Sequence, residues 1–449
     1  MQPDARPTGA FEVTHRMVLG LALPMTFGFL TIPLLGITDT AVAGRLGDPS
    51  MLAGLAIGAV LFDLIFGSFN FLRASTTALV AQAWGRDDRA EQQAVFWRAL
   101  VTAVICGIAI VLMSPLLLTA GLWIMSPDAA TASATSEWFM IRMLSVPAGL
   151  ANFAILGYLL GRGQARIGLF LQVLINSINI VLTVLFGLAL GYGISGIAVA
   201  TAISEALGAA AGLYVVLKPF HARHPFDTPS IFAREKLTAL FVLNGDILIR
   251  TFVLIGAFVI LTRIGSGFGP VALAANAVLM NFFMVAGFWL DGLANAAETI
   301  IGRSIGAAYR PAFERGIWLT GIWSAVLAGF ITLLVLAIGH PMIDFLTTVP
   351  EVRVVAYEHL PWAALTAVSG FLAFHMDGVY IGATWSHAMR NRMLMAFAGY
   401  CLALALLVPW LGNHGLWISL NIFLILRGLL LLQRLPSLKV GLFRPAPVT

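Results

Sequence analysis

The chain has 449 residues, of which 59% are hydrophobic and only 10% are charged, and its formal net charge is +5. A soluble globular domain carries about 25% charged residues, so this composition excludes one. Twelve membrane crossings of about 20 residues would use roughly 240 residues and leave short loops and tails. Lys and Arg are spread through the predicted loops, so we expect no nucleic-acid partner.

Apolar runs separated by polar breaks predict twelve transmembrane helices. The first run follows a polar N-terminus and lacks a small-residue cleavage site, so we expect it to be a retained helix rather than a signal peptide. The first six runs lie near residues 17–43, 53–82, 96–121, 138–161, 167–190 and 193–217. The second six lie near 238–264, 271–302, 316–338, 358–382, 392–411 and 413–433.

The longest polar stretch lies at mid-chain and divides the runs into two sets of six. We predict an N-terminal lobe over 1–217, a cytoplasmic linker over 218–237, a C-terminal lobe over 238–433 and a cytoplasmic tail over 434–449. An even number of crossings places both termini on one side. That side carries nineteen Lys and Arg, against three on the other, so the positive-inside rule predicts that both termini are cytoplasmic.

The two halves repeat each other without a gap over three regions. Gly44 aligns with Gly265, 221 residues later, and Pro49 aligns with Pro270 at the same spacing. The segment 144–161 aligns in the same register with 365–382 and matches Gly157 and Gly161 with Gly378 and Gly382. Because each copy has an even number of crossings, the copies run in the same direction, which predicts two parallel six-helix lobes.

Three motifs resemble one transporter family. FNFLRASTTALVAQAWG (69–85), LDGLANAAETIIGRSIGA (290–307) and MDGVYIGATWSHAMRNRML (376–394) are similar to motifs of the multidrug and toxic compound extrusion (MATE) family, in its DinF branch. The resemblance covers essentially the whole chain. It implies twelve helices in two pseudo-symmetric lobes, a MATE/MOP-type fold. It also implies export of amphipathic, often cationic compounds in exchange for H⁺ or Na⁺ across a bacterial inner membrane.

Asp39 is the first candidate for ion coupling. It lies near the non-cytoplasmic end of the first helix, after Pro24, Pro33 and Gly36, which weaken that helix. An ionised carboxylate facing lipid costs a few kcal/mol, so we expect Asp39 to face the lobe interior and to exchange a proton there. The alternative is an Asp that is merely solvated at the helix end. The position matches the family's first-helix Asp.

The fifth helix carries three polar residues on one face. Asn176, Asn179 and Thr183 follow at i, i+3 and i+7, so they can form a polar patch opposite Asp39 or simply hydrogen-bond between helices as packing. In the resembling family a second Asp occupies the position of Thr183. Its absence removes one titratable group and casts doubt on a mechanism or a sodium site that needs two carboxylates.

Asp63 and Glu205 are secondary candidates for the same site. Asp63 falls near the middle of the second crossing, where it is too deep to be a solvated surface residue and can substitute for the missing acid. Glu205 follows small residues at four-residue spacing on the sixth helix, and it can reach Asn179 or serve in helix packing.

The second half supplies candidates for a substrate cavity. The acids Glu298 and Asp377 can provide counter-charge to cationic compounds, or pair with Arg303 and Arg390. Adaptable apolar lining is available from methionine and aromatic side chains, for which the alternative is a core or lipid-facing position. The lining candidates are Met25, Phe153, Met280 and Phe283.

Other function classes fit less well. No HExxH, Walker A or comparable spacing occurs, so we expect no enzyme, no metal site and no cofactor. Cys106 and Cys401 lie in apolar runs and predict no disulfide. A flippase for lipids or glycan precursors is the real alternative. It would favour a basic cavity, whereas the deep ionisable groups here are mostly acidic, with Arg73, Arg142 and Arg250 as exceptions.

We therefore predict a secondary antiporter that acts on small amphipathic molecules in the bilayer, as a monomer. H⁺ is preferred to Na⁺ as the coupling ion because one carboxylate with amides offers few hard anionic ligands.

Overall fold

The computed structural model describes residues 10–220 and 231–443, in which every regular element is a helix. The chain is an all-α membrane protein, as expected. The first half contains α1 (His15–Leu30), α2 (Ile32–Arg45), α3 (Pro49–Ser68), α4 (Phe71–Gly85), α5 (Arg89–Met125), α6 (Ala129–Met143), α7 (Val146–Gly161), α8 (Ala165–Val184), the π-helix η1 (Leu185–Ala189) and α9 (Gly193–Leu217). The second half contains α11 (Arg234–Ser266), α12 (Pro270–Gly306), α13 (Arg310–Leu346), α14 (Pro350–Gly382) and α15 (Ser386–Leu442).

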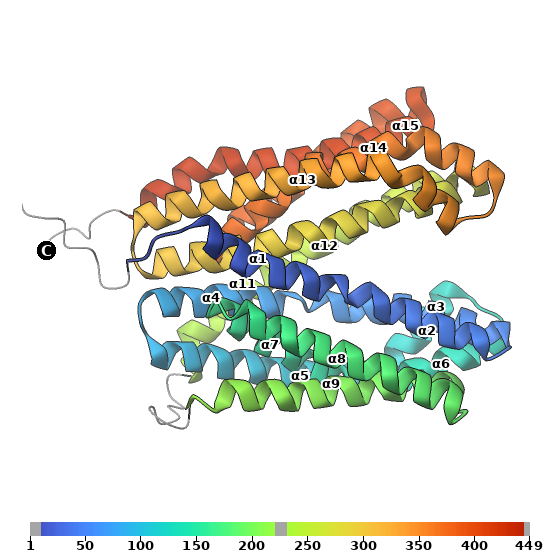
Figure 1. Ribbon diagram of the computed structural model, residues 1–449, viewed down its shortest axis with the longest axis horizontal. Helices are drawn as coiled ribbons and strands as arrows, with labels where there is room; N and C mark the ends of the chain where they lie inside the picture. The colour runs from blue at the N-terminus through green and yellow to red at the C-terminus, as the bar shows by residue number, and fades with distance from the viewer. Residues whose placement is uncertain (1–9, 221–230, 444–449) are drawn as a thin grey trace, which may run out of the picture. The chain divides into compact units, whose positions relative to one another are not determined.

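The helices account for the twelve predicted crossings. Ten are long and apolar enough to cross a membrane, and the bent pair α6 and α7 makes an eleventh. Helix α15 has 57 residues, so at about 1.5 Å per residue it would be far longer than a bilayer core is thick. Its backbone leaves the helical region at Gly412, with φ 54° and ψ −129°. Counted on both sides of Gly412, the described residues contain twelve spans. The helices are labelled in Figure 1.

Helix ends repeat at the spacing that the sequence predicts. Pro49–Gly85, which contains α3 and α4, corresponds to α12, 221 residues later at both ends. Helix α5 corresponds at both ends to α13 with the same spacing, and residues 129–161 correspond to α14. The first-half copies are broken near Phe69 and Leu144, whereas α12 and α14 are continuous. The duplication therefore sets the helix boundaries, while the breaks are particular to the first half.

Paired glycines bring helices close together in both copies. A Cβ on Gly157 or Gly161 of α7 would lie 2.6 or 2.7 Å from backbone oxygens of α4. A Cβ on Gly378 or Gly382 of α14 would lie 2.2 or 2.4 Å from backbone oxygens of α12. These are the glycines that the sequence repeat aligns. They are required because any side chain there would overlap the neighbouring backbone.

The chain folds as two compact units. Unit 1 comprises the residues through Thr26, the short segment Gly85–Asp87 and the residues from Val242 on, and unit 2 comprises Phe27–Trp84 and Asp88–Phe241. The first span is thus shared between the units, with the change inside α1. The predicted division into lobes 1–217 and 238–433 remains a prediction. Residues 221–230 of the predicted linker and 444–449 of the predicted tail lie outside the described residues, whereas 234–237 and 434–442 belong to α11 and α15.

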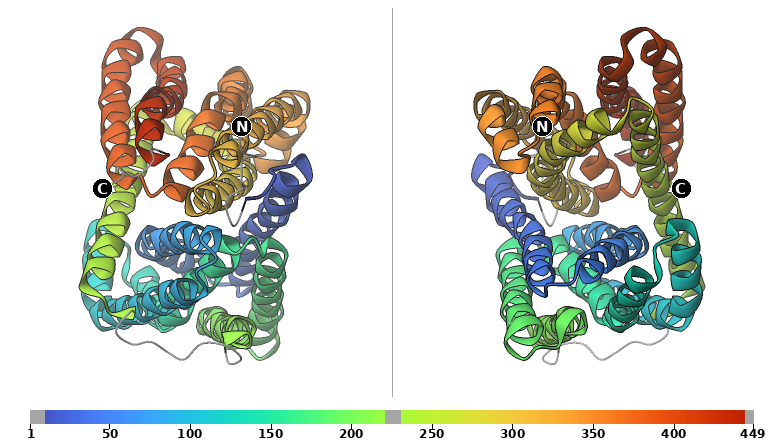
Figure 2. Two further views of the ribbon diagram at one scale, coloured as in Figure 1. Left: turned by 90° about the vertical axis from the view of Figure 1, so that its left-hand side faces the viewer. Right: turned by 90° about the vertical axis from the view of Figure 1, so that its right-hand side faces the viewer.

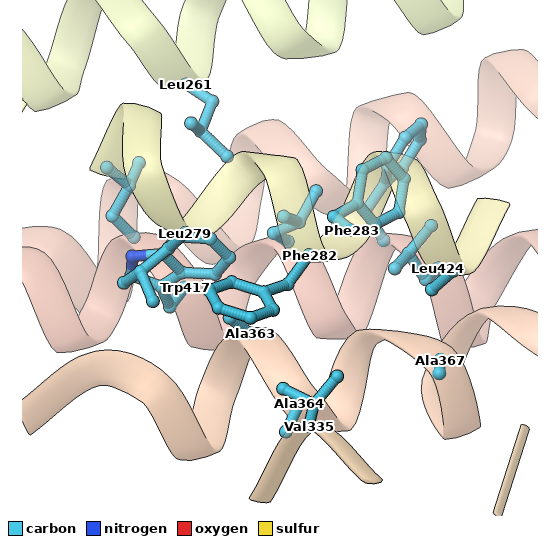
Figure 3. Close-up of a cluster of buried hydrophobic side chains, with 14 of the residues drawn as sticks. Leu261, Leu279, Phe282, Phe283, Val335, Ala363, Ala364, Ala367, Trp417 and Leu424 are labelled. Atoms are coloured by element: carbon cyan, nitrogen blue, oxygen red, sulfur yellow. The ribbon is translucent and has the colours of Figure 1, made fainter. Parts of the chain in front are cut away.

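Unit 1 is built around α14, which packs against α12, α13 and α15. Figure 3 shows part of its core, where Phe282 and Phe283 of α12 lie with Trp417 and Leu424 of α15. The Trp417 indole donates a hydrogen bond to Asn276 Oδ1 at 2.9 Å, which satisfies the polar edge of a fully buried ring. In unit 2, α5 packs on α7 and α8 packs on both α2 and α9. Figure 2 shows the same helices in two views turned by 90° from that of Figure 1.

Both described chain ends lie at one end of unit 1. The Arg315 side chain near the start of α13 donates a hydrogen bond to the Val13 carbonyl at 2.8 Å. Near the other terminus, the Phe443 ring packs against Phe313 with centroids 5.4 Å apart. Because Phe313 and Arg315 are neighbours on one helix turn, the two chain ends share one side, as an even number of crossings requires.

Candidate ion-coupling site

The first span is interrupted where the candidate site begins. Helix α1 ends at Leu30 and α2 begins at Ile32, with Thr31 between them. Pro33 has no N–H to donate to the carbonyl four residues earlier, so the helix is weakened there. The Thr31 hydroxyl donates a hydrogen bond to the Gly28 carbonyl at 2.6 Å, which satisfies an oxygen at the interruption. Helix α2 then runs alongside α8.

Asp39 of α2 accepts a hydrogen bond from Thr183 of α8. The Thr183 hydroxyl lies 3.3 Å from Asp39 Oδ1 and 3.5 Å from Asn179 Oδ1. Thr183 is fully buried, while Asp39 is partly exposed. The carboxyl group is thus held against the interior of unit 2 by a hydroxyl donor on α8.

The polar contacts continue from α8 into α9. The Asn179 amide donates to the hydroxyl of Thr201 at 2.9 Å and to that of Ser204 at 3.4 Å. All three side chains are buried. A run of hydrogen-bonding groups therefore extends from Asp39 across three helices of unit 2, and sequence spacing found its α8 members but not Thr201 and Ser204.

Asn176 lies apart from this run. Its amide donates a hydrogen bond to the Thr31 hydroxyl at the interruption of the first span, and its carbonyl accepts one from Gln172 at 3.2 Å. The three polar residues of α8 thus share a face, as predicted, but serve two places. Asn179 and Thr183 lie toward Asp39, and Asn176 fastens the junction between α1 and α2.

Arg142 of α6 is the main charged group that sequence reasoning left aside. Its guanidinium lies 3.8 Å from the centre of the Phe62 ring and donates a hydrogen bond to Ser145. Its charge interacts with those of three carboxylates, Glu205, Asp39 and Asp63. The signal available in the sequence was an arginine in the middle of an apolar run, which is rare unless the group is paired or functional.

Asp63 and Glu205 belong to the same region through Arg142. Asp63 on α3 interacts electrostatically with Arg142 and makes no recorded hydrogen bond among the described residues. The Asn152 amide of α7 donates to Glu205 Oε2 at 2.7 Å, so Asn152 rather than Asn179 is the hydrogen-bond donor to this carboxylate. Next to Asn152, the Phe153 ring packs on Phe66 with centroids 4.9 Å apart. The acids of unit 2 are therefore grouped with aromatic surface.

Asp377 of unit 1 is bound by two arginines. Arg427 of α15 lies 2.8 Å from its Oδ2, and Arg250 of α11 contacts the same oxygen. Arg390, the alternative partner considered from sequence, instead binds Asp246 at 2.6 Å. A carboxylate between two guanidinium groups presents no net negative charge. The charge of Asp291 also acts on Arg427, so two acids accompany the two arginines in this part of unit 1.

The remaining cavity candidates lie within the packing of unit 1. Met25 is fully buried, Glu298 is 2% exposed, and Phe283 belongs to the core of Figure 3 beside the Phe258 ring. Met280 is partly buried against the same core. Only Phe153, among the apolar candidates, lies in unit 2 near the acids. Within residues 10–220 and 231–443, no group of three His, Cys, Asp or Glu is arranged to hold a metal ion, and both cysteines are free thiols.

Twelve apolar helices from a duplicated six-helix unit, with ionisable side chains buried among them, define a polytopic membrane transporter. The family model described as MatE matches residues 24–185 and again residues 247–408, so each half carries one copy of the family's unit. The chain belongs to the MATE family, in its DinF branch. It is 37% identical to DNA damage-inducible protein F of Escherichia coli (strain K12), over 91% of this chain and 89% of that protein.

Other relatives agree with this assignment. A probable multidrug resistance protein NorM of Deinococcus radiodurans is 27% identical over 95% of this chain and 96% of its own length. Among solved structures, a Vibrio cholerae MATE transporter superposes with a TM-score of 0.88 at 20% identity, covering 94% of this chain and 97% of that one. A MOP superfamily transporter from Pyrococcus furiosus gives 0.87 at 15% identity, covering 96% and 97%. At these identities the structures establish the fold.

Proposed function

We propose that this chain is a proton-coupled antiporter that exports amphipathic cationic compounds, with Asp39 as the group that takes up and releases the proton. The observation that carries the proposal is the Thr183 hydroxyl inside unit 2, which lies within hydrogen-bond distance of both Asp39 Oδ1 and Asn179 Oδ1. An acid held against buried hydroxyl and amide groups can be neutral or ionised, and these two states favour different helix packing. The proton and the substrate then favour different conformations, so binding of one lowers the affinity for the other without direct contact between them.

The surroundings of Asp39 favour H⁺ over Na⁺. A sodium ion requires several oxygen ligands, preferably with more than one negative charge among them. Asp39 has the Thr183 hydroxyl beside it, and the charge that acts on it is the positive charge of Arg142. The guanidinium opposes H⁺ and Na⁺ alike, because either one adds a single positive charge to the carboxylate. The preference for H⁺ therefore rests on the small number of oxygen ligands around Asp39.

A cationic substrate finds counter-charge in unit 2. Three carboxylates there, those of Asp39, Asp63 and Glu205, interact with the single guanidinium of Arg142. Phe66 and Phe153 add aromatic faces, to which organic cations bind well. We assign Asp377 to stabilising unit 1 through its two arginines, and Glu298, Met25, Met280 and Phe283 to its packing.

One observation favours the alternative function, a flippase for lipids or glycan precursors. Arg250 and Arg427 meet at one oxygen of Asp377, and paired guanidinium groups are suited to binding a phosphate group. The charge of Asp291 also acts on Arg427. The two functions differ in a direct assay. In vesicles containing the protein, a flippase would move a fluorescent phospholipid between leaflets in the absence of any drug, whereas an antiporter would leave the lipid in place.

The decisive experiment uses purified protein in vesicles with an imposed pH gradient or, separately, an imposed sodium gradient. We expect the pH gradient to drive counter-transport of a lipophilic cation and the sodium gradient to be ineffective. Asp39→Asn keeps the shape of the side chain but cannot ionise, so it should lose the proton-driven component. Asp48→Asn is the matched control, because Asp48 is an acid that caps α3 through Ser50 and Asn caps equally well. Equal transport by Asp39→Asn and wild type would remove Asp39 from the mechanism.

For its cellular setting, we propose a monomer in the bacterial inner membrane, with both termini in the cytoplasm and with the lobes 1–217 and 238–433 as the two moving parts. The excess of Lys and Arg on the side of the termini supports the orientation.

A further inference from the structure

A pocket of about 590 Å³ opens at the end of unit 1 where the chain termini lie. One side of the pocket is formed by the turn between α14 and α15 and by the first turns of α15. The other side is formed by the last turns of α15. Residues lining it include Arg392, Arg434, His387, Asn391, Met395 and Leu438. The Trp385 ring lies 6.3 Å from that of Phe313, near the start of α13 where Val13 and Phe443 also lie. The pocket therefore lies at one end of the helices, near the described chain ends, and not in their middle.

The pocket is basic, and among the described residues its two arginines have no acidic partner. None of its lining residues is an acid. The nearby acids are already occupied, since Asp246 binds His387 and Arg390, and Glu314 binds Arg310 and Lys439. No described carboxylate forms an ion pair with Arg392 or Arg434, yet the charges of both act on the Tyr380 hydroxyl, which places them near one another.

We propose that this pocket binds the phosphate of an anionic phospholipid headgroup. Guanidinium groups bind phosphate oxygens through paired N–H donors, and two of them facing one space can hold a single phosphate from two sides. Asn391 adds an amide donor at the same place. The group that the pocket would recognise is a negatively charged phosphate. A lipid headgroup and a free phosphate ion both carry this group.

The apolar part of the pocket favours a lipid over a free ion. Met395 and Leu438 line it, and the neighbouring Leu394, Met395 and Val440 are 45%, 50% and 58% exposed. Such side chains at a helix end would lie against acyl chains. A volume of about 590 Å³ is also far larger than one phosphate ion fills, but it suits a glycerophosphate headgroup. The lipid would join the α14–α15 turn to the end of α15, which come from distant parts of the sequence.

The test measures lipid binding by native mass spectrometry and thermal unfolding on the full-length protein in detergent. Three ligands are compared: phosphatidylglycerol, phosphatidylcholine and inorganic phosphate. We expect phosphatidylglycerol to bind and raise the unfolding temperature, and the other two to do neither at equal concentration. Each of Arg392→Gln and Arg434→Gln should weaken phosphatidylglycerol binding about fivefold, the usual effect of one basic group at an anionic surface.

Arg310→Gln is the matched control, because it removes one exposed positive charge from the same end of unit 1 without touching the pocket. If Arg310→Gln weakened phosphatidylglycerol binding as much as the pocket variants do, the binding would reflect general charge attraction. That result would overturn the proposal. An equal effect of inorganic phosphate would assign the pocket to the free ion. If a glutamine variant does not fold, Arg392→Lys and Arg434→Lys keep the charge and should still weaken binding. Absence of any preference of the wild type for phosphatidylglycerol over phosphatidylcholine would also overturn the proposal.

Discussion

At the scale of single residues, the Thr183 hydroxyl leaves the proposed coupling site with one acid, Asp39, at this contact. A hydroxyl donates to the Asp39 carboxylate at 3.3 Å, whereas a second ionised acid at the same place would repel it. The arrangement needs no second proton acceptor next to Asp39. Asp63 and Glu205 are linked to it only through the charge of Arg142.

The first prediction concerns this hydrogen bond. Thr183→Val keeps the shape of the side chain but removes the donor to Asp39. Because one hydrogen bond contributes about 1 kcal/mol, we expect proton-driven transport to slow by about fivefold. Thr183→Ser keeps the hydroxyl and should transport at close to the wild-type rate. The measurement is initial drug uptake in vesicles at one fixed pH gradient, and equal rates for the valine and serine variants would contradict the expected role of the hydroxyl.

The second prediction concerns Asp128, which caps α6 outside the membrane spans. Its carboxylate accepts hydrogen bonds from the Thr131 hydroxyl at 2.7 Å and from the backbone N–H groups of Ala130 and Thr131 at 3.1 Å. The bonds from Thr131 lower the pKa of Asp128 below its ordinary value. The ionised carboxylate therefore stabilises the folded state at any pH above the ordinary pKa of an aspartate. This contribution is lost as the pH falls through the lowered pKa of Asp128.

We expect Asp128→Ala to lower the unfolding temperature in detergent at pH 7, and Asp128→Asn to lower it less, since an amide oxygen still caps the helix. At a pH below the lowered pKa, the protonated carboxyl group still accepts through its carbonyl oxygen, so wild type and Asp128→Asn should unfold at about the same temperature. A difference between these two proteins that persists unchanged into acid would show that the ionised carboxylate is not the stabilising group.

At the scale of elements, close helix contact is set by glycines that recur in both halves. Gly382 of α14 faces the Glu298 carbonyl of α12, and Gly161 of α7 has the same relation to the Thr77 carbonyl of α4. Hydropathy makes all of these segments helical, but the distance between two helix axes depends on the absence of a side chain at these points.

The third prediction follows for Gly382→Ala. The added methyl group would lie 2.4 Å from a backbone oxygen, so α12 and α14 must move apart. Overpacking of this kind costs about 1–3 kcal/mol, and we expect a lower unfolding temperature and yield. Gly329→Ala in α13 is the control, because nothing lies within 4 Å of the new methyl and alanine favours the helix. An unfolding temperature for Gly382→Ala equal to that of the control would contradict the close contact.

At the scale of the whole molecule, two features indicate the membrane topology. The duplication of a six-span unit gives an even number of spans, and the distribution of Lys and Arg gives the orientation. Val13 and Phe443 both contact the first turns of α13, so the two chain ends share one side. Lys and Arg are concentrated in loops on that side, which predicts that it is cytoplasmic.

The fourth prediction is the outcome of reporter fusions. Fusing a fluorescent protein that folds only in the cytoplasm to either terminus should give fluorescent cells. Alkaline phosphatase, which is active only in the periplasm, should be inactive at both places and active when inserted after Asp48 or Asp128, in loops of the opposite side. Active phosphatase at one terminus alone would contradict the even number of crossings, and activity at both would reverse the orientation.

The sequence by itself determined the number of spans, the register of the repeat and the family. These depend on local properties, namely the length of apolar runs and the positions of Gly and Pro, so the spacing of 221 residues and the break at Gly412 could be predicted within a residue or two. The spacing of Asn176, Asn179 and Thr183 also placed these three polar residues on one face of α8.

The tertiary structure alone decided which partner each buried group has. Asp377 pairs with Arg250 and Arg427 from two other helices, Arg142 faces three acids, and Asn176 binds Thr31 rather than the Asp39 region. The physical reason is that these contacts depend on how each helix is rotated about its axis and which helix packs beside it. Side-chain packing over the whole unit sets both the rotation of a helix and the identity of its neighbour. The hydropathy of one segment therefore does not predict either of them.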